Sequence, residues 1–178
     1  MGLDITAYSD IKKLNATLDD DGEAIDNATG EALQWDGMWF STWVNPDFPG
    51  RADDVEDGAV YSYQDCTGHS IGYGGHYWWR NKLAEIAGYP LTEQVQYGRI
   101  ETCHFAGATS AESGPFFELI NFSDCEGVIG TAISRKLAKD FADFEEKAKS
   151  EGGHFYENYQ HWKNAFDMAS NNGCVRFH

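Results

Sequence analysis

The chain has 178 residues, of which 42% are hydrophobic and 15% aromatic, and its formal net charge at pH 7 is −16. This length suits one domain with its own core, and the composition excludes a disordered tail. No apolar run approaches the ~18 residues of a membrane span, and the start of the chain lacks the basic and apolar blocks of a signal peptide. We therefore expect a soluble protein that has no membrane partner.

The negative charge is concentrated in the first third of the chain. Residues 1–65 hold 15 acidic residues against three basic ones, a balance of −12, whereas residues 66–178 hold 14 against 10, a balance of −4. We expect acidic loops around residues 15–34 and 45–58. Such a surface repels DNA and RNA, so we expect no direct binding of nucleic acid. The loops either keep the protein soluble or imitate DNA toward a protein that binds DNA.

Strands are predicted where residues alternate between apolar and polar, or where aromatic and β-branched residues are frequent. These segments are 3–8, 35–44, 59–64, 95–105 and 116–122. Between the first two of them, Ser9 or Asp10 could cap a short helix over residues 11–14.

Three longer segments carry apolar residues at helical spacing. They are a helix that ends at residue 87, with Trp79 and Leu83 in its apolar stripe, and helices over 132–149 and 155–169. Gly88 stands where a C-cap glycine belongs. Residues 174–178 could return as a last strand. Because most strands precede most helices, without βαβ alternation, the sequence predicts one α+β domain over residues 1–178. Its sheet should be mostly antiparallel and packed with about three helices.

The candidate binding residues lie at the start of the first helix. Backbone N–H groups at a helix N-terminus bind anions, and glycines leave them accessible. An arginine in the first turn could add a guanidinium, and aromatic faces could stack on a base. The residues expected to contact a ligand are Tyr73, Gly74, Gly75, His76, Trp78 and Arg80. A structural role is the alternative, because Trp78 could cover a sheet edge and Arg80 could form an ion pair.

Catalytic motifs are incomplete. Residues 68–72 match G-x-S-x-G around Ser70, the nucleophile elbow of α/β-hydrolases. An elbow serine leads straight into its helix, whereas here the helix is expected to begin only after the glycine pair 74–75. Asp124 and Glu126 could act as acid and base, or they could stabilise the start of a helix. We expect no catalytic residue, and a small hydrolase is kept as an alternative.

Metal sites have little support in the sequence. Ligand types occur at Cys66 and His69 and at Cys103 and His104, but no second pair completes them at zinc-finger spacing. The four cysteines are widely spaced, as is typical of reduced thiols in a cytosolic compartment. We therefore expect neither a metal nor a cofactor.

Four stretches of the chain carry a distinctive pattern. They are GY…WRNxLA from residue 72, FSDCEGxIG…LAxDF from residue 122, the opening MGLDI and the closing VxFH. Together they resemble small uncharacterised proteins of phages and prophages, and the likeness spans most of the chain outside the acidic loops. The resemblance implies a genomic setting and adds no catalytic residue.

Two binding hypotheses follow from the resemblance and the candidate residues. The first is a phage-encoded, non-enzymatic anti-defence protein that sequesters a small anionic or nucleotide-like signalling molecule. The second is an acidic, DNA-mimic-like inhibitor of a host defence protein. Both place the protein in the cytoplasm of the bacterial host, and a homo-oligomer is compatible with either.

Overall fold

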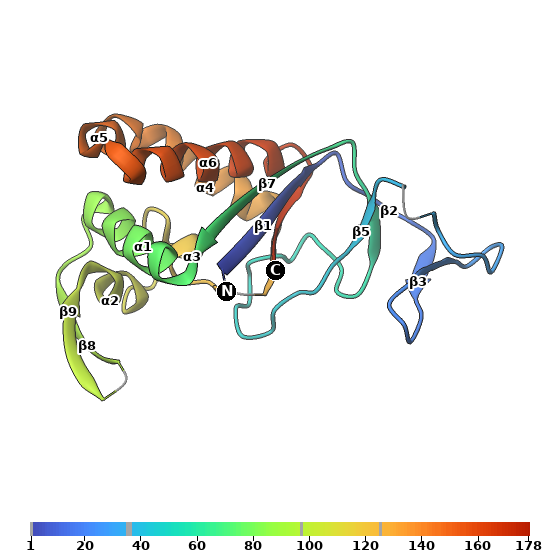
Figure 1. Ribbon diagram of the computed structural model, residues 1–178, viewed down its shortest axis with the longest axis horizontal. Coiled ribbons are helices and arrows are strands. Elements are labelled where there is room, and N and C mark those ends of the chain that lie inside the picture. The colour runs from blue at the N-terminus through green and yellow to red at the C-terminus, as the bar shows by residue number, and fades with distance from the viewer. Residues whose placement is uncertain (1, 35–36, 97, 125) are drawn as a thin grey trace.

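A four-stranded antiparallel sheet lies at the centre of the computed structural model, which describes residues 2–34, 37–96, 98–124 and 126–178 (Figure 1). Its strands, in spatial order, are β10 (Gly127–Ile129), β11 (Cys174–Phe177), β1 (Gly2–Ser9) and β7 (Asp65–Gly72). β1 pairs with β7 along its whole length and with β11 on its other side. The first and last strands of the chain therefore lie side by side in the middle of the sheet.

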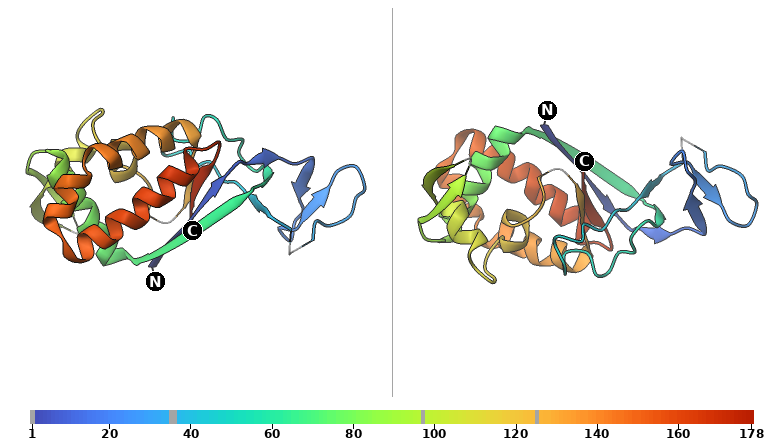
Figure 2. Two further views of the ribbon diagram at one scale, coloured as in Figure 1. Left: turned by 90° about the horizontal axis from the view of Figure 1, so that it is seen from above. Right: turned by 90° about the horizontal axis from the view of Figure 1, so that it is seen from below.

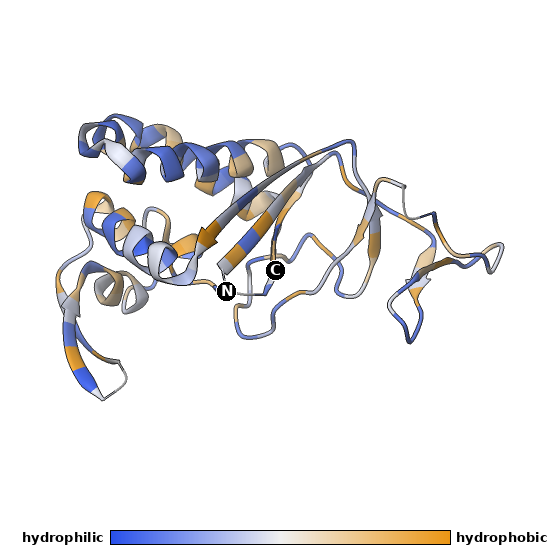
Figure 3. Ribbon diagram, in the orientation of Figure 1, coloured by the Kyte–Doolittle hydropathy of each residue, from blue (hydrophilic) through white to orange (hydrophobic). Residues whose placement is uncertain are grey.

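Helices cover one face of this sheet. They are α1 (Tyr73–Ala87), α4 (Thr131–Asp143) and α6 (Gly153–Ala169), while α5 (Glu145–Glu151) packs against α4 and α6. β1 alternates between hydrophobic and hydrophilic residues (Figure 3). Leu3, Ile5 and Ala7 are therefore buried beneath the helices together with Trp79 and Trp162. No helix in the described ranges is both long enough and apolar enough to cross a membrane.

The opposite face of the sheet, which we call the outer face, is covered only in part. Tyr8, Val128 and Cys174 on this face pack against Ala52 and Val55 of the long segment between two short strands. These strands are β5 (Trp39–Ser41) and β6 (Val60–Ser62), which form a small sheet with β2 (Lys12–Lys13). Beyond it, β3 (Ala16–Leu18) and β4 (Ala24–Asp26) form a hairpin, residues 16–26, which we call the acidic hairpin. Figure 2 shows it at the end of the molecule farthest from the helices.

The connection from α1 to the sheet runs through a second hairpin and two short helices. These elements are β8 (Thr92–Gln96), β9 (Arg99–Cys103), α2 (His104–Thr109) and α3 (Phe117–Ile120). The hairpin projects from the body and exposes Val95 and Ile100, which face each other across its two strands.

The predicted α+β class and the antiparallel sheet are confirmed. The strands expected at 3–8, 59–64 and 174–178 are present, as is the helix expected at 155–169. Gly88 ends α1 in the left-handed conformation, with φ of 89°, as its position predicted. The strand expected at 35–44 is present as β5, although Trp35 lies outside the described residues.

Several local predictions are wrong because long-range pairing outweighs local preference. Residues 11–14 form no helix: the backbone of Ile11 donates to Asn172 O and that of Leu14 to Val60 O, so the segment is extended. The helix expected at 132–149 is divided at Phe144 into α4 and α5. The single strand expected at 95–105 is β9 followed by the start of α2, with the end of β8 before it.

The strand expected at 116–122 is also wrong, since these residues form the short helix α3. Phe116 adopts a positive φ of 57°, which breaks any extended run. Its backbone N–H donates to the Asp140 carboxylate, and its ring is completely buried. The buried ring of Phe116 and the hydrogen bond from its N–H to Asp140 therefore account for the turn at this residue.

Candidate functional site

The structure places the six predicted ligand residues in different surroundings. α1 begins at Tyr73, directly after β7, so Gly74 and Gly75 lie in the first helical turn and form no loop. Tyr73 and Trp78 are exposed, whereas His76 and Arg80 are buried. Two clefts on the described surface, one lined by Trp43 and Arg176 among others and one by Asp10 and Tyr63 among others, contain none of the six.

The guanidinium of Arg80 contacts the end of α3 and the segment between α3 and β10. It donates to Ile120 O at 3.4 Å and to Phe122 O at 3.1 Å, and it lies 3.6 Å from the Asp124 carboxylate. It also stacks over the Phe105 ring, 5.0 Å from the centroid. Both terminal nitrogens of the guanidinium therefore have protein partners, whereas Nε is buried without a hydrogen bond to a described residue. The ion pair that the sequence left open as a structural role is present.

His76 is buried within a stack of aromatic rings. Its ring lies 5.5 Å from that of Trp162, and neither ring nitrogen makes a hydrogen bond with a described residue. Burial and, to a smaller extent, the positive charges of Arg80 and His69 together lower the pKa of His76 to about 3. His76 is therefore a neutral core residue at neutral pH.

This burial predicts a pH-dependent loss of stability. The folded pKa of about 3 lies below the ordinary value of 6.5, so the unfolded chain takes up the proton first. The contribution of neutral His76 to the free energy of unfolding is fully present above pH 6.5 and is lost progressively as the pH falls toward 3. Between pH 7 and pH 5 the wild type should lose about 2 kcal/mol more unfolding free energy than His76→Phe. Urea unfolding followed by tryptophan fluorescence measures this difference, and equal losses in the two proteins would contradict the neutral, buried state.

Ser70 lies inside β7, opposite Asp4 of β1, and is exposed on the outer face. The helix starts sooner than the sequence predicted, but Ser70 is a regularly paired strand residue and stands at no strand-to-helix turn. His69, its neighbour, faces the helices and contacts Asn158 at 3.1 Å. The geometry of a nucleophile elbow is therefore missing at Ser70.

The predicted metal ligands do not converge. Cys66 and His69 lie on opposite faces of β7 because strand residues three apart alternate in direction. Cys103 contacts Tyr77, and His104 contacts the backbone oxygen of Tyr89. Within the described ranges, no group of three or more histidine, cysteine or acidic side chains is placed to hold a metal ion. Cys66, Cys103 and Cys174 are free thiols, and Cys125 lies outside the described residues.

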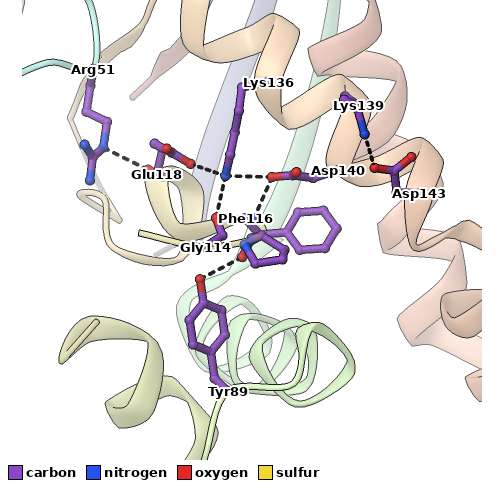
Figure 4. A network of polar contacts seen from close by, with 10 residues as sticks. Arg51, Tyr89, Gly114, Phe116, Glu118, Lys136, Lys139, Asp140 and Asp143 are labelled. Atoms are coloured by element: carbon purple, nitrogen blue, oxygen red, sulfur yellow. Dashed lines mark hydrogen bonds and ion pairs between the residues drawn. The ribbon is translucent and has the colours of Figure 1, made fainter. Parts of the chain in front are cut away.

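Lys136 is at the centre of a cluster of polar contacts between α3 and α4 (Figure 4). Its ammonium contacts the carboxylates of Glu118 at 2.5 Å and Asp140 at 2.8 Å, and it donates to Gly114 O. Asp140 in turn accepts from the backbone of Phe116. Every charge here has a protein partner, so the cluster fixes the turn before α3 and offers no free group to a ligand.

The acidic residues of the two predicted loops have different roles. Asp54 accepts from the backbone of Ala132 at the start of α4, and Asp57 accepts from that of Val44. Asp19 accepts from two backbone N–H groups of its own turn. Several of the charges that suggested DNA mimicry therefore serve the fold.

An open cleft of about 460 Å³ lies on the outer face of the sheet. It is lined by Trp43, Glu126, Gly127, Arg176, Phe177 and His178. These residues come from the loop after β5 and from β10 and β11, which pair with each other. In the sheet, Phe177 of the closing motif is registered with Ile5 of the opening motif on one side and with Gly127 on the other.

The strand register arranges polar residues in rows across this face. Asp4 pairs with Ser70 on one side, and its backbone oxygen accepts from His178 on the other. Two residues farther along β1, the Thr6 hydroxyl and His178 Nε2 lie 3.0 Å apart. Burial lowers the pKa of His178, Arg176 lowers it further, and Asp4 opposes both effects. The imidazole of His178 is consequently neutral at neutral pH.

Arg176 is one of the residues that line the cleft. Its registered neighbours are Thr6 on β1 and Val128 on β10, and its side chain is partly buried. Its guanidinium makes no hydrogen bond or ion pair with any residue that the structure describes. Trp43, which is 44% exposed, also lines the cleft. The cleft thus combines an unpaired cation, an aromatic face and a neutral imidazole.

Together, these observations describe an α+β protein whose antiparallel sheet carries helices on one face and an open, partly polar cleft on the other. No known protein family, curated protein or solved structure matches this chain. Its function is therefore inferred from the residues of the cleft.

Proposed function

We propose that this chain is a phage-encoded, non-enzymatic anti-defence protein that sequesters a small nucleotide-like molecule, and that the ligand occupies the outer-face cleft. The observation that carries the proposal is that the guanidinium of Arg176, which lines the cleft, makes no hydrogen bond or ion pair with a described residue. A partly buried arginine without a partner is satisfied by a bound anion, and a guanidinium binds phosphate through two parallel hydrogen bonds. The phage setting rests on the sequence resemblance alone.

The other residues of the cleft suit the remaining parts of a nucleotide. The exposed face of Trp43 provides a stacking surface for a base. Glu126 and His178 add hydrogen-bonding groups at the rim, and a carboxylate accepts from the amino group of a base. The volume of about 460 Å³ lies within the range of small-molecule sites.

The acidic inhibitor is less well supported. Asp19, Asp54 and Asp57 make hydrogen bonds that stabilise turns and the start of α4, so their charge has a structural explanation. The exposed Asp20 and Asp21 of the acidic hairpin remain, and exposed acidic residues commonly serve solubility.

Ligand binding can be tested with the protein purified from phage-infected cells. We expect native mass spectrometry to show a bound small molecule, and a panel of cyclic nucleotides to include one that raises the melting temperature. For that nucleotide, Arg176→Gln should weaken binding by about 10- to 100-fold, the cost of losing a charged hydrogen bond. Trp43→Ala should weaken it by about 10-fold through lost stacking.

Trp78→Ala is the matched control, because Trp78 is also an exposed tryptophan (52%, against 44% for Trp43) but lies at the predicted site on α1. It should leave the affinity unchanged. A loss of binding in Trp78→Ala together with normal binding in Arg176→Gln would move the ligand to the start of α1. The absence of both a co-purified molecule and a stabilising nucleotide would refute the proposed function itself.

A further inference from the structure

The two edges of the central sheet differ in how far other segments of the chain cover them. The β10 edge is short and covered: Gly130, just after it, donates to Arg51 O, and Asn45 donates to Glu126 O just before it. The β7 edge extends over eight residues. Apart from its bonds with β1, no backbone hydrogen bond of residues 66–72 to another described strand or loop is present. A complete row of donors and acceptors is therefore open along β7.

β7 also lacks the features by which proteins protect such an edge. Exposed edges usually carry lysines, prolines, bulges or a covering loop. β7 has the sequence DCTGHSIG, with Asp65 as its one formally charged residue, and its pairing with β1 is continuous from Gly2–Gly72 to Ser9–Asp65. Figure 2 shows the strand running along one side of the molecule with the helices set back over the sheet. An unprotected, regular edge of this length is suited to pairing with another strand.

We propose that β7 pairs with β7 of a second copy of this chain, antiparallel about a twofold axis at Gly68, so that the two sheets become one. Such an axis places side chains of the same face opposite each other, because strand residues alternate in direction. Gly68 then faces its own copy, where it brings no side chain to the axis. Cys66 faces the partner's Ser70 on the outer face, and Asp65 faces the partner's Ile71, so the acidic side chains do not meet.

Charge placement favours a second copy in this orientation. The acidic hairpin lies beyond the Asp65 end of β7, and antiparallel pairing sends the two hairpins to opposite ends of the joined strands (Figure 1). With ~3.3 Å per residue, the two Asp65 ends are separated by about 20 Å, against a screening length of ~8 Å in physiological salt. Parallel pairing would place both hairpins at the same end and is disfavoured by repulsion.

The mass in solution tests this pairing. Light scattering coupled to size exclusion should give twice the 19.9 kDa of one chain at micromolar concentration. Gly68→Lys should halve this mass, because it places two ammonium groups on the axis. It should leave the monomer folded, since a Cβ at Gly68 would lie 3.5 Å from Ile5 O, an ordinary contact. Ala28→Lys adds the same charge at an exposed position near the acidic hairpin and should leave the dimer intact.

The register has its own readout. In Ser70→Cys, the new thiol should lie opposite Cys66 of the other copy, within the reach of a disulfide. Mild oxidation should then give a covalent dimer on a non-reducing gel, and the added substitution Cys66→Ser should abolish it. A monomeric wild type would leave the edge to a strand of a different protein and would overturn the proposal. A dimer that survives Gly68→Lys, or a Ser70→Cys dimer without the disulfide, would overturn it as well.

Discussion

Trp162→Ala is expected to lower the free energy of unfolding by about 3–5 kcal/mol, the range for removing a large aromatic side chain from a packed core. Trp162 is fully buried on α6, between the helices and the sheet. Its ring stacks on Trp79 at 5.2 Å and lies 5.9 Å from Phe177 of β11. It therefore joins α1, α6 and the sheet at one point, and little around it can close the cavity left by alanine.

Thermal unfolding should show the same effect as a decrease in melting temperature on the order of 10 °C. Trp78→Ala is the matched control because Trp78 is half exposed and meets Phe155 edge-on, so its removal should cost less than about 1 kcal/mol. Trp162→Phe should cost less than the alanine variant, since it keeps a ring and removes a buried indole N–H without a hydrogen-bond partner in the described structure. Equal losses in Trp162→Ala and Trp78→Ala would contradict the packing of α6 on the sheet.

The fold could be predicted where local pattern and burial agree. Residues 3–8 alternate because one face of β1 meets the helices and the other meets solvent or the covering segment. Trp79, Leu83 and Ile86 repeat at helical spacing because a single side of α1 is buried. In these segments, the spacing of neighbouring apolar residues is enough to predict which side chains are buried.

Predictions failed where the decisive partner is distant in sequence. Ile11 is extended because its backbone bonds to Asn172, and Phe116 turns because its N–H meets Asp140. Neither partner can be recognised from the nearby sequence. The start of α1 was misplaced for a different reason: Gly74 and Gly75 favour loops intrinsically, but the helix tolerates them at its exposed first turn.

The cleft was missed although part of its signal is present in the sequence. Residues 174–178 alternate, which places Arg176 and His178 on the face opposite Val175 and Phe177. This pattern alone indicates a polar strand face at the end of the chain. The position of Trp43 depends on how a long, irregular segment folds back over the sheet, and no periodicity describes such a segment.

Arg80→Met is expected to lower the free energy of unfolding by about 2–3 kcal/mol, because it leaves buried carbonyl groups without their charged donor. The guanidinium holds the oxygens of Ile120 and Phe122, and the side chain is almost completely buried. Methionine retains much of the apolar stem, so the loss measures the polar contacts more than the cavity. Urea unfolding at neutral pH provides the measurement.

Asp124→Asn separates the ion pair from the carbonyl contacts. The Asp124 carboxylate is half exposed and 3.6 Å from the guanidinium, so solvent screens the attraction and the variant should cost less than about 1 kcal/mol. A large loss of unfolding free energy in Asp124→Asn would show that the ion pair, and not the contacts with the carbonyl oxygens, accounts for the stabilisation by Arg80. If Arg80→Met were as stable as the wild type but no longer bound the ligand, Arg80 would instead be part of a binding site at α1. Stability and affinity measured on these two variants therefore distinguish an arginine that anchors the 120–124 segment from one that holds a ligand.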